Sequence, residues 1–280
     1  LIMKTYLASV SFIVIILFSL AVYSQNLGLP PQPEKANSGK EIAHSLINLN
    51  LEERDRKIAN QILKGNIPDF LRNTDPVKFS REIKGKKYDI TYYVASDYLA
   101  VGSGKNYFYT PMAPSTAQSI ADSLECILPT QKMVDDIYKN AAIQLAPRPI
   151  PPSPAMTTVR VFIQHTDSIR IQLSKYLNNR NGKMLIAGHK KDIIVSNLIY
   201  ERPVKNVVIY GWHRSPDNPI QPVYGGHFAD WVDYSHGIRL VKNKIRINGQ
   251  LFKIRNILSD TTLCQLLSDE GPILKPYYPH

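Results

Sequence analysis

Apolar side chains recur at helical spacing through much of the first half of the chain. Segments such as IADSL and KMVDDIY place apolar residues three and four positions apart, so that these residues share one face of a helix. Ser115 and Thr130 stand near the starts of two such segments, where a side-chain oxygen can cap free amide groups. The spacing predicts helices over 38–49, 51–71, 113–125, 129–142 and about 158–178.

Runs rich in Val, Ile, Thr and Tyr indicate strands, and most of them lie in the second half. Turn signals separate neighbouring runs, at KGKK and at the Asn248-Gly249 pair. The predicted strands cover 77–83, 87–102, 184–188, 192–200, 204–213, 219–224, 231–241, 244–249 and 250–254, and a short helix is expected within 257–271. The pattern predicts an α+β fold with helices mainly in the N-terminal half and a mostly antiparallel β-sheet in the C-terminal half.

A long apolar run near the start of the chain predicts export. It follows Met3 and Lys4, and Val22 and Ser24 supply the β-branched and small residues expected at the minus-three and minus-one positions. This is typical of a signal peptide over 1–24 that is cleaved after Ser24. A permanent anchor would need about 20 apolar residues with suitable flanks, and no cysteine follows the run to carry a lipid. We therefore expect a secreted or periplasmic protein, soluble and without a permanent membrane span after cleavage.

The rest of the chain predicts one principal unit. Residues 25–37 are polar and proline-rich, as in a flexible leader. Residues 38–280 then form a single α+β domain, and a subdivision at the Pro-rich connector 146–156 is left open. The segment GSGK at 102–105 lacks the earlier glycine and the following Ser or Thr of a phosphate-binding loop, so it predicts a glycine turn between strands.

Charge and cysteine content narrow the partners and the compartment. The formal net charge of +11 favours an anionic envelope polymer or glycan as partner, and no RNA-binding signature points to nucleic acid. Dispersed Lys and Arg that only maintain solubility are the alternative. The two cysteines, Cys126 and Cys264, either form one disulfide in an oxidising compartment or remain buried thiols.

Residues 207–241 carry the densest candidate chemistry. His213, His227 and His236 lie there among aromatic residues, and His189 lies upstream in AGHKKD. Asp233, Ser235 and His236 contain the residue types of a nucleophilic triad, but alternation along a strand would place Ser235 and His236 on opposite faces. A triad from this segment alone therefore requires a bulge or a turn.

Two other mechanisms draw a partner from elsewhere in the chain. Cys126 with His236 would follow the order of papain-like hydrolases, but Cys126 stands where a predicted helix ends, and that end of the helix dipole disfavours a thiolate. A metal site, with zinc the metal considered, could use His189, Asp192, His227 and His236, although none of the specific ligand spacings occurs.

Aromatic residues favour a sugar-binding surface as a further interpretation. Tyr210, Trp212, Tyr224, Trp231 and Tyr234 could form a platform on which sugar rings stack. Hydrolysis by paired carboxylates would draw on Asp97, Asp192, Asp230 and Asp233, but the sequence indicates no particular pair. Packing of Tyr210 and Trp231 in the sheet core explains those two equally well.

Five short blocks resemble a set of exported bacterial proteins whose activity is uncharacterised. They are LPTQKMVDDIY, AGHKKD, YGWH, PIQP and DYSHGIRLV, and the resemblance covers about residues 65–275. It implies that these segments form one unit, and it carries over no catalytic residue and no substrate.

These patterns together predict an exported hydrolase of a cell-envelope or extracellular polymer, either peptidoglycan or glycan. The mechanism would be general acid/base or metal-assisted. The alternative is a non-catalytic envelope or glycan-binding protein. The expected catalytic residues are His236, His189, Asp233 and His227, and the expected substrate contacts are Trp212, Tyr234, His213 and Tyr210.

Overall fold

The computed structural model describes residues 26–176 and 184–280, so the predicted signal peptide lies outside the described residues. Its helices are α1 (Gly39–Leu46), α2 (Leu51–Leu63), α3 (Pro114–Ser123), α4 (Gln131–Asn140), α5 (Val159–Ser174) and α6 (Ile254–Ser259). Short 3-10 helices cover Asp69–Leu71, Pro154–Thr157, Asn197–Ile199 and Leu263–Leu266. The α+β class is confirmed, but the helices occur throughout the chain, with α5 and α6 in its second half.

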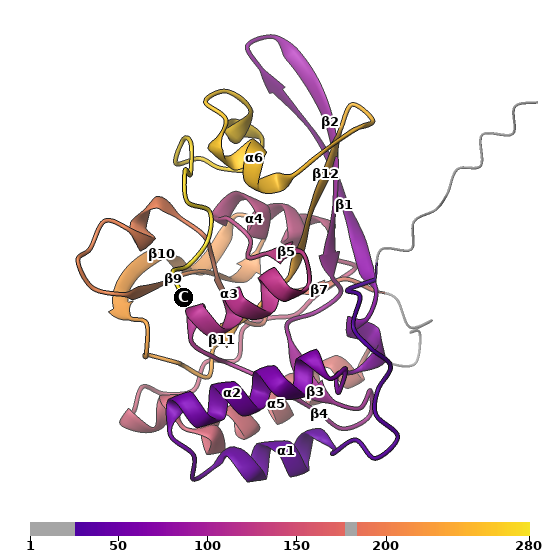
Figure 1. The fold of residues 1–280 in the computed structure, drawn as a ribbon, viewed down its shortest axis with the longest axis vertical. Helices are drawn as coiled ribbons and strands as arrows, with labels where there is room; N and C mark the ends of the chain where they lie inside the picture. Colours follow the sequence, from indigo (N-terminus) through magenta and orange to yellow (C-terminus); the bar gives the residue numbers. More distant parts are fainter. Residues whose placement is uncertain (1–25, 177–183) are drawn as a thin grey trace, which may run out of the picture.

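A larger antiparallel sheet, a smaller mixed sheet and two small strand pairs organise the molecule (Figure 1). The larger sheet has the order β1 (Thr74–Ile83), β2 (Lys86–Ala95), β12 (Val241–Ile247), β13 (Gln250–Phe252), and β5 (Cys126–Ile127) also pairs with β12. The second sheet has the order β10 (Asn218–Phe228), β9 (Asn206–Ser215), β8 (Lys191–Ile193), β11 (His236–Gly237). The small pairs are β3 (Ala100–Gly102) with β4 (Tyr107–Tyr109) and β6 (Ile143–Gln144) with β7 (Ile186–Ala187). Pairing is antiparallel except between β8 and β11 and between β6 and β7.

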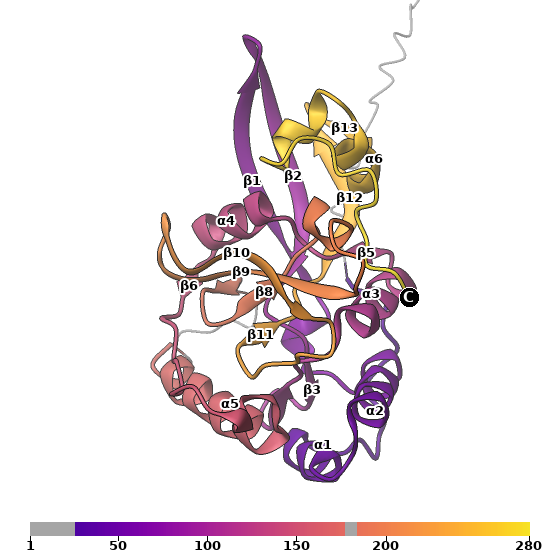
Figure 2. The ribbon, with the colours of Figure 1, turned by 90° about the vertical axis from the view of Figure 1, so that its left-hand side faces the viewer.

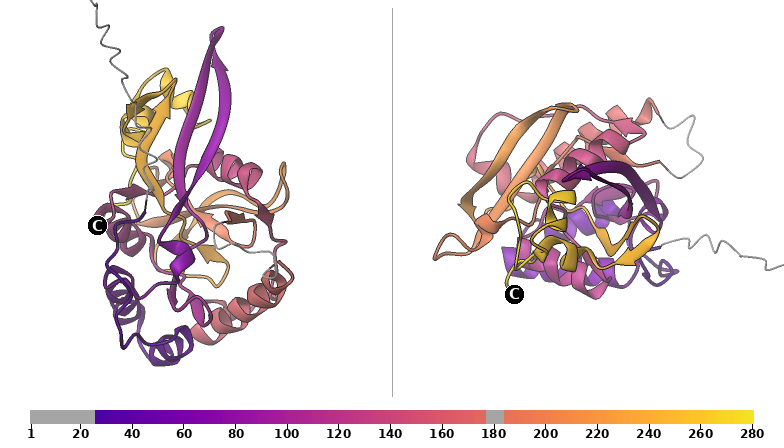
Figure 3. Two further views of the ribbon diagram at one scale, coloured as in Figure 1. Left: turned by 90° about the vertical axis from the view of Figure 1, so that its right-hand side faces the viewer. Right: turned by 90° about the horizontal axis from the view of Figure 1, so that it is seen from above.

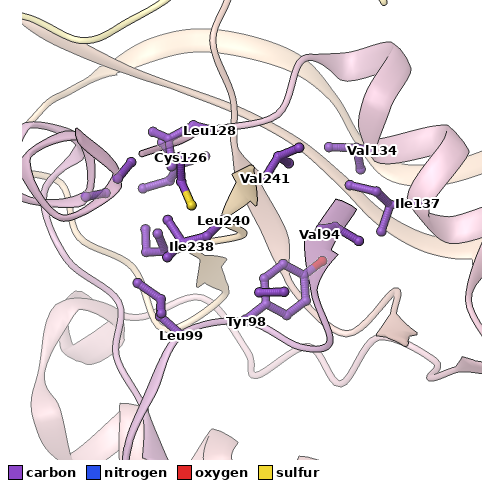
Figure 4. Close-up of a cluster of buried hydrophobic side chains, with 14 of the residues drawn as sticks. Val94, Tyr98, Leu99, Cys126, Leu128, Val134, Ile137, Ile238, Leu240 and Val241 are labelled. Carbon is purple, nitrogen blue, oxygen red and sulfur yellow. The ribbon is translucent and has the colours of Figure 1, made fainter. Parts of the chain in front are cut away.

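The elements surround a core to which both sheets contribute. The β1–β2 hairpin projects at one end of the molecule, whereas α1, α2 and α5 form the other end (Figures 1 and 3). Figure 4 shows part of the core, where Val94 and Tyr98 meet residues from α4 and from the segment 238–241. Among the described residues, no helix is long and apolar enough to cross a membrane.

Local sequence signals explain most element boundaries. The KGKK turn closes the β1–β2 hairpin, GSGK closes β3–β4, and Asn248-Gly249 closes β12–β13, all as predicted. Thr130 caps α4 by accepting the Met133 N–H. The cap expected at Ser115 is wrong: α3 begins at Pro114, whose fixed φ suits the first helical position.

Three predicted elements are shorter than expected. Helix α2 stops at Leu63, followed by Gly65 at φ +79°, a backbone conformation that favours glycine. Strand β8 ends at Ile193 and gives way to a 3-10 turn. In 231–241 only His236–Gly237 is strand within the second sheet, and the residues before it form a turn.

The leader and the connector are attached to the fold. Leu27 is buried and its N–H donates to the Arg72 carbonyl, so the leader contacts the domain at this residue. In the Pro-rich connector, the Tyr234 hydroxyl accepts the Ile150 N–H and donates to the Ile150 carbonyl. Tyr234 thus holds the connector against the second sheet.

Candidate functional site

Most of the side chains predicted to act on substrate are buried. His189, His236 and Asp233 are 0%, 2% and 3% exposed. The predicted substrate contacts share this burial: Trp212, Tyr234, His213 and Tyr210. His227 alone among the eight is partly exposed. The aromatic side chains of Tyr210, Trp212 and Tyr234 suggested a binding surface. In the structure these large apolar side chains are packed in the core.

The turn at Asp233 brings the candidate triad residues together without making a triad. The Asp233 carboxylate accepts both the N–H (2.7 Å) and the hydroxyl (2.6 Å) of Ser235. The Asp233 N–H approaches His236 Nδ1 at 3.5 Å, and the His236 N–H donates to the Asp233 carbonyl. Strand alternation is therefore the wrong description of this segment, but the outcome is similar, because the Ser235 hydroxyl is bonded to the carboxylate and not to the imidazole.

His236 is fixed beside Lys191 by parallel pairing of β11 with β8. Burial lowers the pKa of His236 to about 3, with the charge of Asp233 opposing that effect. The imidazole is consequently neutral near pH 7 and is a weak base, since efficient general bases have a pKa near the working pH.

His189 lies in a different cluster. Its Nε2 is 3.2 Å from Asp97 Oδ1, an electrostatic contact whose angle does not make a hydrogen bond. The Tyr109 hydroxyl donates to the other Asp97 oxygen at 2.8 Å, and the Tyr98 ring packs edge-on against His189. Burial lowers the pKa of His189, although Asp97 favours its protonated form.

Lys190, which the sequence analysis did not single out, is buried beside this cluster. Its Nζ donates to the Tyr234 carbonyl at 2.6 Å and lies 3.1 Å from His165 Nδ1. Burial lowers the pKa of Lys190 to about 7. The signal that could have revealed it is the pair of lysines in GHKKD, which stands between two apolar strands.

Arg239 and Asp192 form the third part of the buried network. Arg239 donates to the Ala95 carbonyl (2.9 Å) and the Ile186 carbonyl (2.7 Å), and its guanidinium lies 4.0 Å from the centre of the Tyr98 ring. The Tyr98 hydroxyl donates to Asp192 at 2.7 Å. Burial raises the pKa of Asp192 to about 6 against the opposing charge of Arg239.

His213 and Trp212 have structural partners of their own. His213 Nε2 lies 3.0 Å from Asp135 Oδ1, the same oxygen that accepts the Tyr210 hydroxyl at 2.8 Å. The Trp212 indole N–H donates to the His189 carbonyl at 3.2 Å. Asp135 lies on α4, far away in sequence, so the spacing of residues 207–241 could not reveal it.

An aromatic surface formed by β10 and the segment just after it is the exposed part of the predicted cluster. We call the set Tyr224, His227 and Trp231 the β10 aromatic surface. Tyr224 is 44% and Trp231 37% exposed. The His227 ring stacks on Trp231 (centroids 5.3 Å apart, planes at 17°) and meets Tyr224 edge-on at 5.0 Å. Figure 2 shows β10 at the outer edge of its sheet.

Titratable groups adjoin this surface. Burial and the charge of Lys191 lower the pKa of His227, whereas Asp233 opposes them. Lys191 is partly exposed, and its Nζ lies 5.1 Å from the centre of the Trp212 ring. The charge of Asp233 raises the pKa of His236, and the charges of Lys191 and His227 lower it, in addition to the larger effect of burial. The structure thus brings His227, Asp233 and His236 into electrostatic range of one another, and it separates His189 into the Asp97 cluster.

The metal and cysteine mechanisms find no support in the geometry. Among the residues that the structure describes, no three His, Cys, Asp or Glu side chains are grouped so that they could hold one metal ion. Cys126 opens β5 and not a helix, and its sulfur lies among Leu128, Leu240 and other apolar side chains (Figure 4). Burial raises the pKa of the Cys126 thiol to about 12, which opposes thiolate formation.

Comparison with known proteins finds no match for this chain. No family model matches the chain, and no curated protein and no solved structure is similar to it at a significant level.

Proposed function

We propose that this protein binds a glycan of the cell envelope or the extracellular space through the β10 aromatic surface. The observation that carries the proposal is the continuous row of Tyr224, His227 and Trp231, partly exposed along the edge strand β10 and just beyond the turn that follows it. Sugar rings present apolar C–H faces that pack on aromatic side chains, while nearby polar groups bond their hydroxyls. The export signal expected from the sequence is consistent with such a ligand.

The local backbone supports this arrangement. A Cβ at Gly226 would lie 2.2 Å from the Tyr224 hydroxyl, so the ring of Tyr224 lies over the strand where a side chain is missing. Tyr224 thereby reaches His227, and the stack with Trp231 continues the row. Lys191 and a neutral His227 supply donors and an acceptor beside the rings.

A hydrolase acting at the same surface is the second candidate. It is favoured by the group formed by His227, Lys191, Asp233 and His236. The pKa values of His227, Lys191 and His236 are all lowered, and shifted pKa values near a surface are typical of catalytic sites. Only His227 and Lys191 of this group are partly exposed, so they would be the groups that transfer protons to or from substrate. Asp233 and His236 are buried, so their role would be to position His227 and Lys191.

Binding and turnover can be separated with purified mature protein. We would measure binding to peptidoglycan and soluble polysaccharides, together with the release of new reducing ends or peptides. Trp231→Ala and Tyr224→Ala should each weaken binding about tenfold or more, since Trp and Tyr side chains that dominate a binding interface typically contribute about 2 kcal/mol or more. Phe252→Ala, at an exposed aromatic on the other sheet, is the matched control and should bind as the wild type does.

The outcomes distinguish the two candidates. If Trp231→Ala and Tyr224→Ala remain folded and bind every ligand as the wild type does, the glycan surface is wrong. Turnover that His227→Ala abolishes while binding persists would favour the hydrolase. A bound ligand recovered intact from the wild type would exclude hydrolysis of that ligand.

A further inference from the structure

A hollow lined by basic side chains lies apart from the β10 aromatic surface and is built from other elements. It lies where α1, the β3–β4 turn and α5 meet, and it has a volume of about 320 Å³. Helices α1 and α5 are in contact at the end of the molecule opposite the β1–β2 hairpin (Figure 1). Its polar lining includes Lys40, His44, Lys105, Thr166, Asp167 and Arg170. None of these residues belongs to the β10 aromatic surface.

The charge of the hollow suits a doubly negative group. Lys40 from α1, Lys105 from the GSGK turn and Arg170 from α5 are cationic, and Asp167 is the carboxylate among them. One Arg170 nitrogen donates to the Lys105 carbonyl at 2.7 Å, and the other is 3.8 Å from Asp167. Asp167 therefore offsets one of three positive charges, and two remain.

One buried hydroxyl adjoins the hollow. Thr166 lines the hollow, is 3% exposed, and its Oγ1 has no hydrogen-bond partner among the described residues. An unsatisfied buried hydroxyl costs about 1–3 kcal/mol. The Oγ1 atom is itself closed to solvent, so a ligand oxygen in the hollow would bond it after rotation about χ1 of Thr166.

The backbone amides of α1 are already occupied, so side chains must hold the ligand. The Gly39 N–H donates to the Asn106 carbonyl at 2.8 Å, and the Lys40 N–H donates to Asn106 Oδ1 at 3.0 Å. These two bonds tie α1 to the β3–β4 turn and position Lys40 and Lys105 on the same rim. The positive end of the α1 dipole adds to their field.

We propose that this hollow binds the phosphate monoester of a sugar-sized ligand through Lys40, Lys105, Arg170 and Thr166. A phosphate monoester carries close to two negative charges at pH 7, which matches the excess positive charge of the lining. Lys and Arg are the usual partners of phosphate, and Arg forms charge-assisted bonds with it. A volume near 320 Å³ is at the lower end of small-ligand sites.

The test uses hexose phosphate as the probe. Isothermal titration of the mature protein with glucose 6-phosphate, in a buffer free of phosphate and sulfate, should give one site per chain, and inorganic phosphate should compete. Lys105→Gln and Lys40→Gln should each weaken binding about tenfold or more, because each removes a charge-assisted contact. Lys253→Gln, an exposed lysine outside the hollow, is the charge-matched control and should bind normally.

Thr166→Val separates a ligand contact from a structural role. The substitution replaces the hydroxyl with a methyl group of similar size, so it should stabilise the unliganded protein or leave it unchanged, while weakening glucose 6-phosphate binding severalfold. Loss of stability would contradict the unsatisfied hydroxyl. The proposal is overturned if glucose 6-phosphate does not bind, if glucuronate binds as tightly, or if Lys105→Gln and Lys253→Gln have equal effects. Glycan binding at β10 is measured with different variants, so either site can fail alone.

Discussion

At the scale of single residues, Lys190 shows how burial changes the chemistry of a group. The side chain is 1% exposed, and its amine bonds the Tyr234 carbonyl and faces His165 Nδ1. Both contacts need only donors, which a neutral amine can supply. The pKa of Lys190 is lowered from 10.5 to about 7 because burial disfavours its charge.

This lowered pKa predicts a specific pH dependence of stability. Between about pH 7 and 10.5 the unfolded chain binds the Lys190 proton more tightly than the folded chain, so stability rises with pH across this window, by up to about 1.4 kcal/mol per pH unit. Below that window Lys190 is protonated in both states, so the destabilisation by the buried charge is at its maximum and no longer changes with pH. Lys190→Met should abolish this slope in urea unfolding measured at several pH values.

The control for this prediction is an exposed lysine. Lys253→Met should retain the pH slope of the wild type, since its amine is in solvent. Equal slopes in the wild type and Lys190→Met would show that Lys190 is charged in the folded protein at neutral pH.

At the scale of elements, Arg239 links strands that do not follow one another in the chain. Its guanidinium bonds carbonyls at the end of β2 and in β7, and it lies in the field of Asp97 and Asp192. Loss of the guanidinium would remove a cation that these buried carboxylates face, and removing one partner of a buried ionic group typically costs about 3–5 kcal/mol.

Arg239→Met should therefore lower the free energy of unfolding by about 3–5 kcal/mol in urea titrations. Arg246→Met provides a matched control on β12, because Arg246 is exposed and bonds only the nearby Gly249 carbonyl among the hydrogen bonds of the described residues. The control should change stability by about 0.5 kcal/mol or less. An Arg239→Met effect as small as that of the control would disprove the proposed link between strands.

At the scale of the whole molecule, noncovalent packing holds the fold together. Cys126 and Cys264 are both free and buried, so the disulfide left open by the sequence is not formed. Apolar side chains from both halves of the chain fill the core, as Figure 4 shows for Val94, Val134 and Ile238. Stability therefore does not depend on a covalent cross-link.

Reductant should consequently leave the thermal unfolding midpoint of the protein unchanged. A thiol reagent should label both cysteines in denaturant and react slowly with the native protein, because both are buried. A midpoint that falls on reduction, or fewer than two reactive thiols after unfolding without reductant, would show that the two cysteines form a disulfide.

Local signals predicted much of the fold because they act over a few residues. The turn at Asn248-Gly249 and the cap at Thr130 depend on backbone geometry within a few positions of each. The 231–241 segment was assigned wrongly as one strand, because the bonds from Ser235 to Asp233 and the pairing of β11 with the distant β8 decide its conformation. Such long-range pairing has no signature in a local pattern.

The sequence by itself determined the α+β class, the hairpin turns and the concentration of His and aromatic residues within 207–241. Only the tertiary structure decided which of those residues meet solvent, because burial depends on neighbours from distant segments, such as Asp135 beside His213 and Asp97 beside His189. The same packing left Tyr224, His227 and Trp231 at the edge of a sheet. It also assembled the basic hollow from α1, α5 and the GSGK turn. These three segments are far apart in the sequence, so their charges line one hollow only when the chain folds.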